Sequence, residues 1–159
     1  MKTLKGMALL FTALLLAPFA GIARVLAPRG VDALNTAGSY DEVYTRSAQV
    51  AIGEHLLVTF GTAPGTQVTL NTASTRPLGN ACDEAAVGTP VGVRPLIGPP
   101  RTMIGSKAIA AGVRVYGTAG GKVTDAVVSG AYLVGEALTA CTGDGAEFIV
   151  SPLSPVINP

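Results

Sequence analysis

From residue 43 onward, the sequence consists of short apolar runs that Gly, Pro, Asn or Asp interrupt every few residues. The runs are rich in Val, Thr, Ile and Leu, and such runs between turn residues are typical of short strands joined by tight turns. No stretch after residue 42 shows a helical period over ten residues or more. The pattern therefore predicts an all-β core, either a compact β-sandwich or a small β-barrel of about ten short strands.

The expected strands cover residues 42–50, 55–60, 67–70, 77–82, 90–96, 101–104, 113–116, 122–126, 131–138 and 146–153. Single turns of helix are expected at 83–87 and 139–142. Alternation within the strands predicts seven core residues. They are Val113, Val115, Val123, Leu133, Leu138, Phe148 and Val150.

A weak internal repeat divides the core. The triplet Gly-Thr-Ala at 61–63 recurs at 117–119, and Gly79 recurs as Gly135, both at an offset of 56 residues. One such unit is too small to bury a core alone, so the two units are expected to pack together into one sandwich or barrel.

The predicted core, 43–159, therefore consists of two related halves, about 43–98 and 101–155. They meet near residues 96–101, where Pro95, Pro99 and Pro100 make a central strand unfavourable because proline has no N–H to donate.

The N-terminus has the layout of a secretory signal peptide. Lys2 and Lys5 precede an apolar run at 7–19, and small residues follow up to Ala23. If the segment 1–23 is retained, it is an apolar arm that packs on a neighbouring subunit, or a membrane anchor. Residues 24–42 show no sustained period and are expected to form an extended linker. The candidate contacts to other subunits or to a capsid are Met7, Leu10, Leu14, Phe19, Val25 and Leu26.

Two cysteines, Cys82 and Cys141, fit either redox compartment. In an exported protein they form a possible disulfide, and in the cytosol they are small buried thiols. There is no Cys-x-x-Cys motif, which argues against a zinc or redox site.

The charge content argues against several functions. Only 13% of residues are charged, and 11 basic residues face 10 acidic ones, so no basic face for nucleic acid is expected. A surface with so few charges solubilises a monomer poorly, and other subunits are expected to cover much of it.

No motif in the sequence supports catalysis. The one histidine, His55, stands in an apolar stretch without a Gly-x-Ser-x-Gly motif. The Gly-rich stretch 117–124 fails the phosphate-loop pattern, and its Gly-Gly pair is typical of a hairpin turn. The stretch 143–145 has a single carboxylate, too few ligands for a calcium loop, and its Gly-Asp-Gly sequence is typical of a turn. We therefore expect no catalytic residue, no cofactor, no metal and no enzymatic activity.

Three blocks of the core, 77–98, 104–126 and 131–155, resemble the small capsid cement, or head decoration, proteins of tailed phages and prophages. The blocks combine Gly-Gly and small-residue turns with hydrophobic strands, in the same order and spacing as in that family. The resemblance implies an all-β domain that binds the outside of an assembled capsid, with the major capsid protein as partner. It also implies a homo-oligomer, expected to be a trimer, located on the virion.

The signal-like N-terminus departs from this family. It leaves open a second hypothesis, an exported β-sandwich that serves as a binding or cell-surface module. A membrane is an expected partner only if the N-terminal segment acts as a signal or an anchor.

Overall fold

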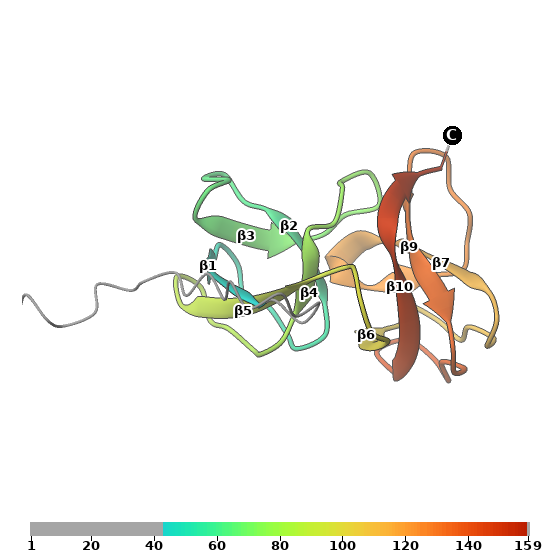
Figure 1. The fold of residues 1–159 in the computed structure, drawn as a ribbon. Coiled ribbons are helices and arrows are strands. Elements are labelled where there is room, and N and C mark those ends of the chain that lie inside the picture. Colours follow the sequence, from blue (N-terminus) through green and yellow to red (C-terminus); the bar gives the residue numbers. More distant parts are fainter. Residues whose placement is uncertain (1–42, 159) are drawn as a thin grey trace, which may run out of the picture. The chain divides into compact units, whose positions relative to one another are not determined.

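The computed structural model describes residues 43–158, which form an all-β fold of ten strands (Figure 1). This confirms the fold class that the sequence predicts. The strands are β1 (Tyr44–Ala48), β2 (Leu57–Phe60), β3 (Gln67–Leu70), β4 (Gly79–Ala81), β5 (Pro90–Pro95), β6 (Arg101–Ile104), β7 (Arg114–Gly117), β8 (Val123–Thr124), β9 (Tyr132–Ala137) and β10 (Glu147–Ile157). A 3-10 turn, η1 (Ala119–Gly121), connects β7 to β8. The predicted segments 1–23 and 24–42, with all six contact candidates from Met7 to Leu26, lie outside the described residues.

Strands β1 to β5 form a closed barrel, here called the N-terminal barrel, in the order β1-β3-β2-β4-β5. The first strand closes the ring, because β1 pairs antiparallel with β5 and parallel with β3. Four valines from three strands fill its interior and are at most 1% exposed: Val58, Val68, Val91 and Val93. Their β-branched side chains suit both the strand conformation and this packing.

Strands β6 to β10 form a five-stranded sheet, here called the C-terminal sheet, in the order β6-β10-β9-β7-β8. Its two edge strands approach one another through a parallel bridge between Gly105 and Val123. The core of the sheet includes Met103, Phe148 and Val150, which are at most 3% exposed.

The two strand systems have the same connectivity. In each, the first strand pairs antiparallel with the fifth, the fifth with the fourth, the fourth with the second, and the second with the third. The seam is parallel in both, a ladder between β1 and β3 and a bridge at Gly105 in the C-terminal sheet. An isolated antiparallel bridge also recurs, Ile52 with Ala85 and Ile109 with Cys141. The chain therefore contains one strand arrangement twice. The expectation that both units share one sandwich or barrel is wrong, because the N-terminal barrel closes by itself around its own hydrophobic cluster.

Strand register defines which residues correspond. Val58 lies opposite Gly79 as Val115 lies opposite Gly135, so the two glycines of the sequence repeat occupy equivalent places. The Gly-Thr-Ala triplets do not. Phe60 lies opposite Val68 and Gly117 lies opposite Val123, so Gly117 corresponds to Phe60 and not to Gly61. The triplet therefore starts one residue after the equivalent position in the N-terminal barrel, so its recurrence in the sequence does not reflect equivalent places.

The two predicted helical turns are wrong. Ala85, in the segment 83–87, forms the bridge with Ile52, and Cys141, in the segment 139–142, forms the bridge with Ile109. Backbone hydrogen bonds to Ile52 and to Ile109, which are far away in the sequence, therefore replace the bonds of a helical turn in the two segments. Their small side chains fit these buried sites, which a local helical pattern does not reveal.

The predicted hairpin turn at Gly120 and Gly121 is confirmed. It joins the antiparallel strands β7 and β8, and φ is 71° and 73° at the two glycines. A side chain is disfavoured in this left-handed region, so glycine suits both positions.

The core predictions hold for most residues. Val115, Val123, Phe148 and Val150 are buried, Val113 packs partly buried against the same cluster, and Leu133 is half-buried. The prediction that Leu138 belongs to the core is wrong, because its side chain is 48% exposed. It follows β9 in the same phase as exposed Glu136, whereas the inward position of that strand is Ala137.

Candidate functional site

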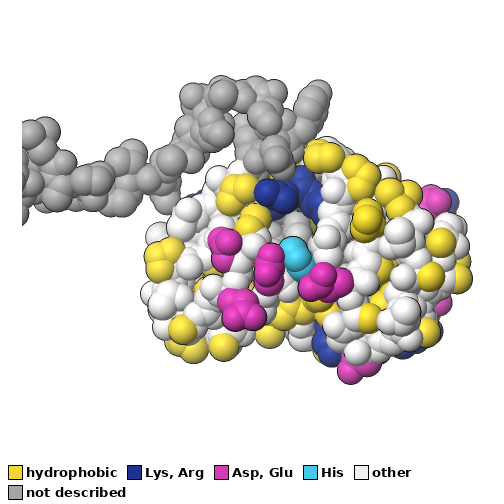
Figure 2. Space-filling model, turned by 90° about the horizontal axis from the view of Figure 1, so that it is seen from below, with side chains coloured by type: hydrophobic (Ala, Val, Ile, Leu, Met, Phe, Trp, Pro, Cys, Tyr) yellow, Lys and Arg dark blue, Asp and Glu magenta, His cyan; other side chains and the backbone are white. Residues whose placement is uncertain are grey.

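Charged side chains are sparse on the described surface. On the face shown in Figure 2, acidic and basic groups lie among broad uncharged areas. Lys107 pairs with Asp125 and Lys122 pairs with Asp144, each with a nitrogen–oxygen distance of 2.6 Å. Exposed pairs of this kind stabilise a fold only weakly.

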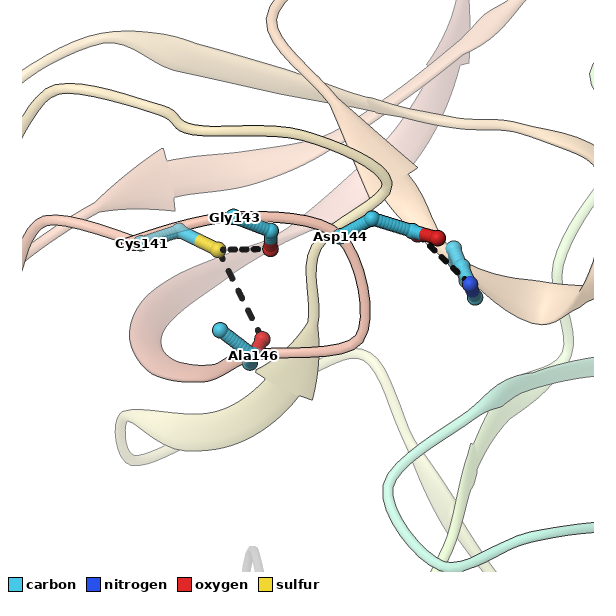
Figure 3. A network of polar contacts seen from close by, with 5 residues as sticks. Cys141, Gly143, Asp144 and Ala146 are labelled. Atoms are coloured by element: carbon cyan, nitrogen blue, oxygen red, sulfur yellow. Dashed lines mark hydrogen bonds and ion pairs between the residues drawn. The ribbon is translucent and has the colours of Figure 1, made fainter.

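One of these pairs belongs to the loop that leads from β9 to β10 (Figure 3). The Cys141 thiol donates to the carbonyl oxygens of Gly143 at 3.2 Å and Ala146 at 3.5 Å. Lys122 holds Asp144 from outside the loop. The stretch 143–145 is thus a turn, as its sequence indicates.

The two cysteines occupy different surroundings. Cys141 is buried in the core of the C-terminal sheet. Cys82 is half-buried and directly follows β4 of the N-terminal barrel, and no disulfide joins it to Cys141 in the structure.

His55 lies in the turn that leads into β2. Its φ is 64°, and the corresponding residue of the C-terminal sheet is Gly112, with φ of 78°. The backbone N–H of each donates to the corresponding carbonyl, Ala81 and Ala137. The Nε2 atom of His55 lies 3.3 Å from a carboxylate oxygen of Glu54. His55 therefore has a definite place in a recurrent turn.

Within residues 43–158, no cluster of three or more His, Cys, Asp or Glu side chains has the geometry to hold a metal ion. In the same part of the chain, no helix combines the length and hydropathy needed to cross a membrane.

An open groove lies beside β2 and the connection that follows β5. Its volume is about 590 Å³, and most of its lining is apolar. Phe60, at the end of β2, is 50% exposed at the groove, and Ile97 of the connection to β6 is 49% exposed. Arg76 is the charged side chain in its lining. Such a groove suits an apolar partner segment more than a charged ligand.

A second apolar surface lies where β10 ends. Exposed side chains gather here from β10 and from the loop before β9: Val127, Val128, Leu153, Val156 and Ile157. The loop and the strand end are joined by Asn158, whose side chain donates to the Val128 carbonyl at 3.3 Å.

Sequence reasoning did not find either apolar surface, because it placed the contact candidates on residues 7–26. The available signal was weak, namely apolar residues such as Val156 and Ile157 outside the predicted strands.

Tyr44 and Arg46 lie on β1, at the closing strand of the barrel. The Arg46 guanidinium stands over the Tyr44 ring, 5.2 Å from its centre. Burial raises the pKa of the Tyr44 phenol above its ordinary value of about 10, and the charge of Arg46 offsets part of this rise.

The stability of the fold is therefore expected to fall as the pH rises above about 10. The folded state keeps Tyr44 protonated to a higher pH than the unfolded state does. The stabilisation is fully present below the unfolded pKa and is lost as the pH passes the folded pKa. Tyr44→Phe should show a smaller loss between pH 9 and pH 11 in urea unfolding, with Tyr132→Phe as the matched control. An equal loss in wild type and Tyr44→Phe would contradict this.

Two strand systems of equal connectivity, joined in one chain, define a tandem all-β fold with exposed apolar surfaces. No family model matches the chain, and no curated protein does. Among solved structures, the chain is similar to the head fiber gp8.5 N base of bacteriophage phi29. The TM-score is 0.60 at 13% sequence identity, and the alignment covers 74% of this chain and 98% of that one. This likeness shows a common fold.

Proposed function

We propose that the chain is a structural protein of a phage virion, a decoration (cement) protein that binds the outer surface of the capsid and stabilises the shell. The observation that carries this proposal is the shared fold with the base of a phage head fiber, which aligns over 98% of its length. The three sequence blocks that resemble cement proteins support it independently. The partner is the major capsid protein, the chain acts as a homo-oligomer, and the role needs neither catalysis nor a cofactor.

The surface chemistry suits this role. Broad uncharged areas and exposed apolar side chains such as Phe60 and Leu153 favour contact with other proteins. A protein that binds only the closed shell stabilises that shell by mass action, and its effect grows with its concentration.

Particles with and without the chain test the proposal. Electron microscopy should show density on the outer capsid surface only when the chain is present, and those particles should release their genome at a higher temperature. Purified chain added back to deficient particles should restore both the density and the thermal resistance. Identical outer surfaces in the two preparations would overturn the proposal.

The lysine-flanked apolar run at residues 7–19 favours one alternative, an exported binding or cell-surface module. An intact-mass measurement separates the two. Loss of residues 1–23 together with absence from particles favours export, whereas recovery of the chain on particles favours the virion role.

A further inference from the structure

The N-terminal barrel has an outer face that the C-terminal sheet covers. Leu57 and Leu96 are at most 2% exposed and belong to the hydrophobic core of the C-terminal sheet, although they come from β2 and from the connection after β5. The side chain of Asn80 donates to the Thr102 carbonyl at 3.5 Å, and the N–H of Gly121 donates to the Asn71 carbonyl at 3.0 Å. This internal junction buries both amides, Asn71 and Asn80, to 3% exposure or less.

Among residues 43–158, no segment covers the corresponding face of the C-terminal sheet. In the N-terminal barrel, Leu57 of β2 lies opposite Asn80 of β4. In the C-terminal sheet, the equivalent pair on β7 and β9 is Arg114 and Glu136. Both are exposed. Leu96 follows Pro95, which lies opposite Gly79, just as Leu153 follows Pro152, which lies opposite Gly135. Leu153 is 46% exposed, against 2% for Leu96.

Other apolar residues continue this uncovered face. Val128, Val156 and Ile157 are 52 to 59% exposed. Arg114, Val156, Ile157 and Asn158 line one hollow of about 180 Å³, and the Asn158 side chain donates to the Val128 carbonyl. We call the set Arg114, Val128, Glu136, Leu153, Val156 and Ile157 the tail face. Exposed apolar residues gathered in one place mark an interaction site.

The element that covers the junction also has an exposed counterpart. Within the chain, the β7–β8 turn packs on the barrel so closely that a Cβ at Gly121 would stand 2.5 Å from the Leu57 carbonyl oxygen. The matching element of the N-terminal barrel is the β2–β3 turn. Its Phe60 takes the place of Gly117 and is 50% exposed, and residues 62–66 are all exposed. We call residues 60–66 the head face.

We propose that the tail face binds the head face of a second copy of this chain, so that the surfaces equivalent to the two sides of the internal junction meet between copies. Continuity with the internal junction identifies the occupant, because the same strand arrangement already covers the equivalent face once. The contact joins two different surfaces, so it is heterologous and leads either to a closed ring or to a chain of copies.

Complementary variants test this inference. Leu153→Glu breaks the tail face and Phe60→Glu breaks the head face, each at an exposed site where the substitution leaves the fold intact. Each variant of the full chain should be monomeric in sedimentation equilibrium, with a dissociation constant raised at least about tenfold. A one-to-one mixture should form heterodimers, because the intact head face of one variant meets the intact tail face of the other.

Val87→Glu serves as the matched control, since Val87 is 67% exposed and lies on neither face. It should associate as the wild type does, and circular dichroism should show the same fold for all variants. A monomeric wild type at about 100 μM, variants that associate normally, or a mixture that stays monomeric would each overturn the inference. A monomeric wild type would also contradict the homo-oligomer of the proposed function, whereas attachment to the capsid is measured separately on particles.

Discussion

Replacing Phe148 by alanine is expected to lower the free energy of unfolding by roughly 3–5 kcal/mol. Phe148 is 3% exposed, lies opposite Met103 of β6, and belongs to the main cluster of the C-terminal sheet. Its removal loses both apolar burial and the contacts around the cavity that remains. Because a domain of this size is stable by only about 5–15 kcal/mol, the loss is a large part of the total.

The adjacent residue provides the control. Ile149 lies on the same strand but is 42% exposed on its outer side, so Ile149→Ala should cost less than about 1 kcal/mol. Urea unfolding of both variants measures the difference. A cost below about 1 kcal/mol for Phe148→Ala would show that this side chain does not contribute to the core.

Alanine at either repeated glycine should destabilise the chain to a similar degree, by about 3 kcal/mol, the upper end of the usual cost of overpacking. A Cβ at Gly79 would fall on the backbone oxygen of Arg94, and one at Gly135 would fall on that of Ser151. Backbone atoms of a paired strand cannot rotate away, so the strands themselves must separate. Equal costs are expected because the two glycines occupy equivalent places.

Gly143→Ala is the control for both substitutions, since a Cβ there meets no atom within 4 Å and its backbone needs no left-handed φ. Thermal unfolding of the three variants gives the comparison. If Gly79→Ala or Gly135→Ala were tolerated as well as Gly143→Ala, the close strand approach would be wrong.

The strands themselves could be predicted from the sequence, because alternation and turn residues are local signals. Val115, Val123 and Val150 follow that alternation and are buried as expected. Leu138 breaks it, since the inward phase of β9 ends at Ala137. Only the pairing with β7 and β10, which shifts register on both sides of β9, decides which residues face the core.

The candidate interaction surfaces were beyond sequence reasoning for a different reason. Leu96 and Leu153 stand in the same Pro-Leu context, and nothing local distinguishes them. Leu96 is buried because the C-terminal sheet, which follows it in the chain, packs against it. Leu153 is exposed because the described residues contain no third strand system that could cover it in the same way. Which of two similar residues forms a contact depends on what the rest of the chain places against it.

The pairing of first and last strands also orders events during synthesis. The N-terminal barrel can close once β5 has emerged from the ribosome, whereas the C-terminal sheet needs β10, which is synthesised after the other nine described strands. Until then, Leu57 and Leu96 of the finished barrel have no cover from the other half. A chain shortened within β10 would therefore keep the ladders of the barrel but lose the strand that joins β6 to β9, and would leave both leucines exposed to chaperones and proteases.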